Sequence, residues 1–330
     1  MLEKQLISII MSTKDTEKKM LEQAVESILH QTYKNIEFII VCDGSTNDLK
    51  ILKKYNDSRI KLIVHEKSVG LTKSLNEALK CASGEYIARM DSDDISILNR
   101  LEIQCEFLNV NKDIDVCSMY AKFIGDKNGI MDDIFIKPYQ KKAELFIYNR
   151  VVHPCVMIRK SFIEKYKISY DETYRYSQDY ELWARICKFS DIYIIPQIGI
   201  NYRIHKKQIS QDKIIEQNEL CRRIYLRNLE ELGIENPEEN VKFLFYLSNK
   251  TEPLNDFELI ENFIKNVICI NKEKKIYDDK TLKDILYYRY IILCYRKMKI
   301  LEVLKTIFKF DLLEIIANKI MIKIKFLKYN

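Results

Sequence analysis

Residues 85–94, EYIARMDSDD, join an apolar run of strand length directly to three carboxylates. Three earlier apolar runs have a similar length, at residues 6–11, 36–42 and 60–64. Segments with apolar residues at helical spacing separate them, at residues 18–31, 49–55 and 71–81. Strands that alternate with helices are typical of a parallel sheet covered by helices on both faces, so this part of the chain predicts an α/β fold.

Polar side chains follow three of these four predicted strands. Ser12 and Thr13 follow the first strand, Asp43-Gly44-Ser45 follows the second, and residues 91–94 follow the fourth. In a parallel sheet of this kind, ligands bind beyond the carboxyl ends of the strands. We therefore expect these polar groups to line one site.

The pattern changes along the rest of the chain. Helical and extended segments are mixed between residues 99 and 203, at 101–110, 116–124, 155–158, 178–188 and 192–203. Beyond residue 211 the strand patterns fade and helices are predicted, at 212–232, 238–249, 256–268, 281–296 and 300–328. The sequence therefore predicts a mostly parallel sheet flanked by helices in residues 1–210, and an all-helical domain in residues 211–330.

Composition and cysteine spacing indicate the cellular compartment. Nine cysteines are scattered without a Cys-x-x-Cys pair, which favours reduced thiols over a disulfide framework or a zinc site. Residues 1–10 combine an acid, a base and a short apolar run, which is typical of a strand and not of a signal peptide. No segment reaches the roughly 20 uncharged apolar residues of a membrane-spanning helix. We therefore expect a cytoplasmic protein.

The acidic cluster, defined as Asp91, Asp93 and Asp94, is the first candidate for chemistry. Three carboxylates within four residues repel one another, and a hard divalent cation such as Mg²⁺ or Mn²⁺ would relieve that repulsion. Taken alone, such a cluster is also compatible with a solvated turn that caps the next helix. Its position at a strand end, together with the other polar motifs, favours the cation.

Three further motifs each allow a structural and a functional interpretation. Asp43 with Gly44 can form a common turn, or it can place a carboxylate against the edge of a nucleobase. Gly70 precedes a helix whose N-terminus would face a diphosphate, or which merely needs a flexible start. Asp179 begins an amphipathic helix, either as an acid favoured by the helix dipole or as a general base. Spacing alone leaves these alternatives open.

Taken in chain order, these motifs resemble the inverting family 2 glycosyltransferases with the GT-A fold. The matching segments are ISIIMST (7–13), HQTYKNIE (30–37), VCDGST (41–46), GLTKSLN (70–76), ARMDSDD (88–94), DYELW (179–183) and YRIH (202–205). They span roughly residues 5–210, nearly two-thirds of the chain. The resemblance implies transfer of a sugar from a UDP-sugar donor to an acceptor hydroxyl.

The resemblance also implies roles on the donor side. The nucleotide would be bound by residues at six matching positions: Thr13, Asp43, Gly70, Lys73, Asp91 and Ser92. Among these, Asp43 would contact uracil and Asp91 would hold ribose or diphosphate. Asp93, the second acid of an Asp-x-Asp motif, would coordinate Mn²⁺ or Mg²⁺. His205 would approach the same metal or the diphosphate, unless it is a structural or surface histidine.

On the acceptor side, Asp179 matches the catalytic base of the family, which removes a proton as the acceptor hydroxyl attacks the anomeric carbon. A single displacement inverts the configuration, so that an α-linked donor gives a β-linked product. His153 and Arg100 are candidates for the acceptor site. Alternatively, His153 is structural and Arg100 reaches phosphate or pairs with the acidic cluster.

Three departures from the family pattern bear on the mechanism. Lys14 and Asp15 stand where the family often has Tyr and Asn, which argues against base stacking there. Gln178 stands where an acidic residue often precedes the base, which leaves Asp179 as the single candidate. The Gln-x-x-Arg-Trp element of processive synthases is absent, because the single Trp of the chain, Trp183, follows Leu182. We therefore expect one sugar to be transferred per encounter.

The C-terminal end of the chain is basic. Residues 285–330 hold ten Lys or Arg and three acidic residues, although the whole chain has a formal charge of only +6. Within this stretch, residues 297–328 mix apolar and Lys residues as an amphipathic helix does. Such a helix either lies on an anionic membrane surface or packs on the catalytic domain with a solvated Lys face. Nucleic acid is disfavoured as a partner, because no recognition motif accompanies the charge.

The resemblance also suggests a biological setting. It implies assembly of a bacterial surface polysaccharide or lipo-oligosaccharide, with a UDP-hexose or UDP-N-acetylhexosamine as donor. The acceptor would be a glycan or a lipid-linked glycan, and the protein would be cytoplasmic or peripheral at the inner face of the membrane. Two alternatives stay open from the sequence: a nucleotidyltransferase, which would carry a glycine-rich signature near the first strand, and a catalytically inactive nucleotide-sugar-binding protein.

Overall fold

The chain divides into two compact units in the computed structural model. The structure describes residues 5–131, 141–205, 213–251 and 257–297, together with residues 299, 303, 306 and 307. One unit comprises residues 1–133 and 150–217, and the other comprises residues 134–149 and 218–330. The predicted domain boundary near residue 210 and almost all of the predicted basic helix at 297–328 lie outside the described residues.

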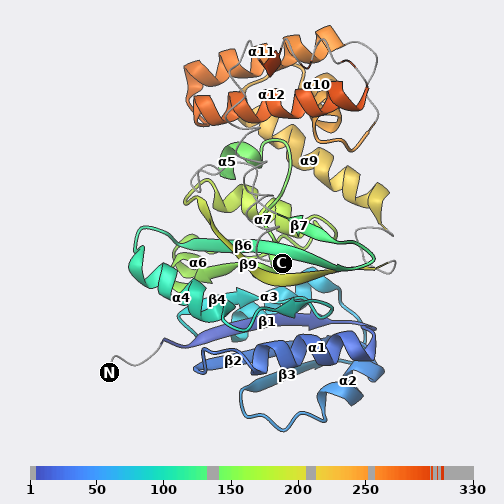
Figure 1. The fold of residues 1–330 in the computed structure, drawn as a ribbon, viewed down its shortest axis with the longest axis vertical. Coiled ribbons are helices and arrows are strands. Elements are labelled where there is room, and N and C mark those ends of the chain that lie inside the picture. The colour runs from blue at the N-terminus through green and yellow to red at the C-terminus, as the bar shows by residue number, and fades with distance from the viewer. Residues whose placement is uncertain are drawn as a thin grey trace. The chain divides into compact units, whose positions relative to one another are not determined.

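The first unit begins with a parallel sheet (Figure 1). Its strands pair in the order β3-β2-β1-β4, over Ile60–His65, Ile36–Asp43, Ile7–Thr13 and Tyr86–Arg89. Every residue of β1 and β2 is buried, as expected of parallel strands that are covered on both faces. On one face, Ile9 and Met11 of β1 share a hydrophobic cluster with Leu21 and Ile28 of helix α1 (Lys18–Leu29).

The two helices that follow β2 and β3 begin directly at the polar motifs. Helix α2 (Thr46–Leu52) starts three residues before the predicted position at residue 49. The reason is a cap, because the hydroxyl oxygen of Ser45 accepts a hydrogen bond from the amide of Asp48 (3.3 Å). Helix α3 (Leu71–Cys81) starts directly after Gly70, at the predicted position.

Beyond β4 the sheet becomes mixed. It continues through β8, β6, β9 and β5, over Met157–Arg159, Val116–Gly125, Ile192–Ile204 and Ile95–Ser96. β6 and β9 are parallel, whereas the β4–β8, β6–β8 and β5–β9 pairs are antiparallel. β7 (Gly129–Met131) runs antiparallel to β6, because a parallel neighbour would need a much longer crossover connection. The predicted α/β class is confirmed, and the antiparallel pairs are an addition to the predicted parallel strands.

Helical segments connect the strands in this part of the first unit. They are α4 (Arg100–Val110), the 3-10 turn η1 (His153–Cys155), α6 (Lys160–Tyr166) and α7 (Gln178–Ile186). Helix α7 carries Asp179 and Glu181 in its first turn. The predicted base therefore lies at the beginning of a helix, as the sequence indicated.

The second unit is helical, which confirms the predicted helical C-terminal region (Figure 1). Its helices are α5 (Lys141–Glu144), most of α9 (Ile214–Leu232), α10 (Pro237–Leu247), α11 (Phe257–Lys274) and α12 (Asp279–Arg296). The side-chain amide of Asn228 donates to the carbonyls of Leu145 and Phe146, so α9 holds the α5 segment in place. Among the helices that the structure describes, none is both long and apolar enough to cross a membrane.

Candidate active site

The carboxyl ends of the parallel strands bring the predicted polar motifs together. In the ladders, Thr13 at the end of β1 is the partner of Cys42, and Asp43 at the end of β2 is the partner of His65. β4 pairs with the other side of β1, and the acidic cluster follows it almost at once. One edge of the sheet therefore carries all three motifs.

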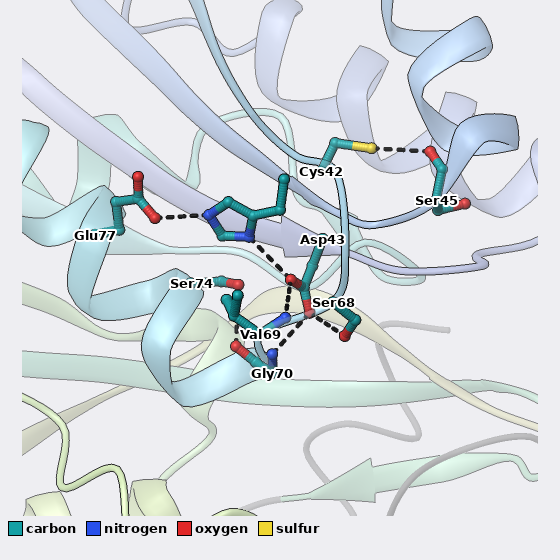
Figure 2. Close-up of polar contacts among 9 residues, drawn as sticks. Cys42, Asp43, Ser45, Ser68, Val69, Gly70, Ser74 and Glu77 are labelled. Atoms are coloured by element: carbon teal, nitrogen blue, oxygen red, sulfur yellow. Dashed lines mark hydrogen bonds and ion pairs between the residues drawn. The ribbon is translucent and has the colours of Figure 1, made fainter.

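The Asp43 network consists of Asp43, His65, Glu77 and the segment Ser68–Gly70 (Figure 2). Four groups surround the Asp43 carboxylate: Oδ1 contacts Nδ1 of His65 (2.9 Å) and the amide of Val69 (2.7 Å), and Oδ2 contacts the hydroxyl of Ser68 (2.7 Å) and the amide of Gly70 (3.0 Å). Burial by itself would raise the pKa of Asp43, but these hydrogen bonds outweigh it and lower the pKa. Asp43 is therefore a buried, ionised anchor for the segment that precedes α3.

Two glycines border this network in different ways. Gly44 has a φ of +77°, and a Cβ there would lie 2.5 Å from the backbone nitrogen of Ser68. Gly70 has a φ of +98°, but a Cβ there would meet no described heavy atom within 4 Å. Gly44 therefore permits a close approach of two backbone segments, whereas Gly70 leaves open space at the start of α3. Lys73, also predicted at the nucleotide site, is exposed in the first turn of α3.

A chain of hydroxyl groups joins the end of β1 to the acidic cluster. The hydroxyl of Thr13 donates to Oδ2 of Asp48 (2.6 Å), which also accepts from the amide of Thr16 (3.3 Å). The hydroxyl of Thr16 lies 2.9 Å from that of Thr13 and 2.8 Å from that of Ser92. Asp48 is fully buried, and its Oδ1 has no partner among the described residues. Thr13 and Ser92, both predicted nucleotide residues, are thus linked through Thr16.

Each carboxylate of the acidic cluster has a donor of its own. Asp91 pairs with the buried guanidinium of Arg89, and Oδ2 of Asp93 lies 2.9 Å from Nε2 of His205. Oδ1 of Asp94 accepts from the backbone amide of Arg203 (2.7 Å). Burial first, and then the neighbouring carboxylates, raise the pKa of Asp93 and raise that of Asp94 well above its usual range. These donors therefore leave negative charge in the cluster incompletely balanced.

A divalent cation fits the residues found here. Among the described residues there is no group of three or more His, Cys, Asp or Glu side chains that could hold a metal ion by themselves. Asp93 and His205 do form a pair with one oxygen and one nitrogen donor, 112 residues apart in sequence. Mg²⁺-type sites in nucleotide enzymes commonly take one or two protein ligands and complete their coordination with water and substrate phosphates. The pair and the excess negative charge around it are compatible with such a site.

The pKa of the phenol of Tyr202 on β9 is raised. Burial raises the pKa of the Tyr202 phenol, and the negative charges of four carboxylates raise it further: those of Asp91, Asp94, Asp93 and Asp179. The pKa of Tyr170 is also raised, by burial and by the negative charges of Asp179 and Asp91, although the positive charge of Arg89 lowers it. The proximity of the predicted base, Asp179, to the predicted metal ligand, Asp93, stays a prediction.

The two candidates for the acceptor site are buried. His153 lies 2.8 Å through Nε2 from the hydroxyl of Tyr170, and its ring packs edge-on against Trp183. Burial, and to a smaller extent the charge of Arg89, lower the pKa of His153 well below its usual range, so the ring is neutral. Arg100 is fully buried, and its Nη1 donates to the carbonyls of Arg89 (3.2 Å) and Pro154 (2.5 Å). Their role in acceptor binding stays a prediction.

Several residues of this region were not identified from the sequence. Arg89 is one of them. Its position two residues before Asp91 could have indicated the pairing, since alternate residues of a strand share a face. His65 is another, and it could have been found by aligning the ends of the predicted strands, which brings it opposite Asp43. Tyr202 and Asp48 come from distant segments that no local pattern connects to the acidic cluster or to Thr13.

Sequence comparisons connect this architecture to known proteins. The model of a family described as "Glycosyl transferase family 2" matches residues 8–167. An uncharacterized glycosyltransferase of Methanocaldococcus jannaschii is 35% identical over 225 residues, which cover 66% of this chain and 77% of that protein. The Escherichia coli protein WfgD, named as a UDP-Glc:alpha-D-GlcNAc-diphosphoundecaprenol beta-1,3-glucosyltransferase, is 31% identical over 252 residues, 69% of this chain and 94% of its own.

A solved structure shows the same fold. Residues 1–349 of TarS from S. aureus, in complex with UDP-GlcNAc, superpose with a TM-score of 0.59 at 18% sequence identity. The match covers 88% of this chain and 91% of that chain. At this level of identity the likeness establishes the GT-A type of architecture, and the chemistry has to be argued from the residues.

Proposed function

The chain belongs to glycosyl transferase family 2, and from this premise we propose that it moves one hexose or N-acetylhexosamine from a UDP-sugar to a hydroxyl of a glycan acceptor. The observation that carries the proposal is the meeting of Thr13, Asp43 and the acidic cluster at the carboxyl ends of β1, β2 and β4. The name of WfgD, which specifies a UDP-glucose donor and a lipid-diphosphate-linked acceptor, supports the same donor class and a lipid-linked glycan acceptor. Assembly of a bacterial surface polysaccharide or lipo-oligosaccharide is the corresponding setting.

On the donor side, the nucleotide would lie across the carboxyl ends of β1, β2 and β4. We assign its binding to the residues at those ends and at the start of α3: Thr13, Asp43, Gly70, Lys73, Asp91 and Ser92. The first amides of an α-helix have no partner within the helix, and its N-terminus carries partial positive charge. The start of α3 therefore suits an anionic diphosphate, and the exposed ammonium of Lys73 adds a positive charge there.

Asp93 and His205 would hold a Mn²⁺ or Mg²⁺ ion, because Oδ2 of Asp93 and Nε2 of His205 are suitable ligand atoms that lie 2.9 Å apart. When bound, such an ion supplies positive charge opposite the departing nucleoside diphosphate. The chain's own residues prepare this position. Arg89 orients Asp91 from beneath, and the amide of Arg203 holds Asp94.

On the acceptor side, Asp179 would act as the general base. Its carboxylate accepts the proton of the acceptor hydroxyl while that oxygen attacks the anomeric carbon and the bond to the diphosphate breaks. The attack comes from the face opposite the leaving group, so the configuration at that carbon inverts. Asp179 lies in the first turn of α7.

Titration calorimetry with UDP tests the donor site directly. Wild type, Asp93→Ala and the control Asp113→Ala, which changes an exposed acid, are each titrated with UDP in the presence and absence of Mn²⁺. We expect metal-dependent binding in wild type and control, and its loss in Asp93→Ala. UDP release from UDP-glucose and UDP-N-acetylglucosamine, with a lipid-diphosphate-linked acceptor, then identifies the sugar. The absence of UDP binding in wild type under both conditions would overturn the proposed donor class.

A further inference from the structure

The side chain of His65 lies between two carboxylates. His65 ends β3, and its Nδ1 is 2.9 Å from Oδ1 of Asp43, while its Nε2 is 2.7 Å from Oε2 of Glu77 on α3 (Figure 2). An ionised carboxylate only accepts hydrogen bonds, so each ring nitrogen must carry a hydrogen to satisfy its partner. The geometry therefore requires the doubly protonated, positively charged form of the ring.

The charges that face His65 favour this form. Burial alone would lower the pKa of His65, but the hydrogen bonds to Asp43 and Glu77 and their negative charges outweigh burial and raise it. Asp43 faces the ring from β2, and Glu77 faces it from α3. The ring thus ties the ends of two neighbouring strands to the helix that follows them.

The Asp43 carboxylate has no acceptor position to spare. A carboxylate offers about four lone-pair directions, two on each oxygen. In this structure His65 and Val69 occupy those of Oδ1, and Ser68 and Gly70 occupy those of Oδ2. A nucleobase N–H group approaching Asp43 would have to displace one of these donors. The part that we assign to Asp43 in nucleotide binding is therefore indirect, through the Ser68–Gly70 segment that it holds in place.

We propose that His65 is a positioning residue for the donor nucleotide, acting as a cation clamped between Asp43 and Glu77 that fixes the Ser68–Gly70 segment and with it the start of α3. This inference rests on the proposed function, because it assigns the start of α3 to the nucleotide diphosphate. Without the imidazolium, Asp43 loses one of its four partners and the link to α3 through Glu77 disappears. The segment then samples other positions, and donor binding weakens while the chemical step at Asp179 is preserved.

Steady-state kinetics with a UDP-sugar separate this role from a general structural one. We compare His65→Gln with the control His30→Gln, which changes an exposed histidine whose ring contacts only a backbone carbonyl among the bonds described. Loss of hydrogen bonds to a charged group corresponds to a rise in the KM of the donor of about tenfold, with kcat within about threefold. The control should leave both constants unchanged. A fall in kcat at constant KM, or no change in either constant, would overturn the proposal.

The pH dependence of donor binding gives a second readout. The protonated ring is the form that positions the segment, so UDP affinity should be highest below the pKa of His65 and should fall as pH rises through it. His65→Gln should remove this step. Glu77→Gln keeps an acceptor for Nε2 but removes a negative charge, so it should move the step to lower pH. An identical pH profile in wild type and both variants would contradict the inference.

Amide hydrogen exchange tests whether His65 fixes the Ser68–Gly70 segment, even if the proposed function is wrong. The amides of Val69 and Gly70 donate to Asp43, so their protection measures the positioning itself. We expect faster exchange in peptides that span residues 66–76 of His65→Gln, and unchanged exchange in His30→Gln. If wild type bound no UDP, the donor assignment would fail while this measurement still tested the clamp. Unchanged exchange in His65→Gln would overturn the clamp.

Discussion

The Asp43 network and the acidic cluster differ in how far hydrogen bonds stabilise their buried carboxylates. Around Asp43, every acceptor direction of the carboxylate is matched, and its pKa is lowered. In the acidic cluster, burial and mutual repulsion raise the pKa of Asp93 and Asp94, and Oδ2 of Asp94 has no partner among the described residues. Hydrogen bonds therefore offset the cost of burying charge in the first region, whereas in the second they do not.

The difference follows from where the donors come from. The Asp43 network takes its donors from one short segment and the neighbouring strand, which hold their positions through backbone contacts. The carboxylates of the acidic cluster take one donor each, from β4 and from the end of β9 more than a hundred residues later. We infer that the network fixes the shape of the donor site and that the cluster responds to what binds there.

The largest expected effect concerns Asp179, the proposed base in the first turn of α7. Asp179→Asn keeps the shape of the side chain but removes its ability to take a proton, so kcat should fall by about 10²- to 10⁴-fold. Because Asp179 is assigned to no nucleotide contact, the affinity for UDP should stay within about twofold. Single-turnover transfer measures the first quantity and titration calorimetry the second.

A matched exposed change, Asp113→Asn, should affect neither quantity. Full turnover in Asp179→Asn would show that Asp179 is not the general base, and the acidic cluster would then have no assigned catalytic partner. A loss of UDP affinity as large as the loss of kcat would instead show that Asp179 belongs to the donor side.

The next effect tests whether the Asp43 network is as tightly built as its contacts indicate. In Gly44→Ala the new Cβ would lie 2.5 Å from the backbone of Ser68 at a positive φ, so both strain and a clash oppose folding. In Gly70→Ala only the backbone conformation opposes it, at a cost of about 1–3 kcal/mol. Urea denaturation should therefore show a larger loss of unfolding free energy for Gly44→Ala. Equal losses of unfolding free energy in the two variants would mean that the close approach of Ser68 to residue 44 does not affect stability.

The sequence predicted the parts of the fold that depend on local patterns. The strands β1, β2 and β4, which are buried, and β3, which is only partly buried, follow from their apolar runs, and the helices between them follow from helical hydrophobic periodicity. The start of α2 was placed three residues late, because its cap depends on the hydroxyl of Ser45 rather than on apolar spacing. The antiparallel pairing of β8 with β4 and β6 has no local signature at all, since it depends on which strand edge is free.

The candidate site was predictable to the extent that its residues stand at strand ends. Asp43, Asp91 and Thr13 follow apolar runs and therefore meet at one edge of the sheet. The side-chain contacts within the site could not be predicted in this way. The pairing of Arg89 with Asp91, and of His65 with Asp43 and Glu77, depends on side-chain directions and strand register. The proximity of His205 to Asp93 was suggested by the family resemblance and could not be derived from spacing across 112 residues.

The smallest expected effect is at Lys73, the exposed member of the proposed donor site. Its ammonium is solvated at the start of α3, so its attraction for a diphosphate is weakened by water and by salt. Lys73→Ala should raise the dissociation constant for UDP by about two- to fivefold at low ionic strength, and the difference should shrink at about 0.5 M salt. Lys80→Ala, an exposed lysine in the last turn of the same helix, is the matched control and should have no effect. A loss of UDP affinity that persists in high salt would mean that Lys73 closes over the bound nucleotide and is shielded from solvent. Lys73 would then belong to a rigid part of the site, as the Asp43 network does, and not to its solvated part.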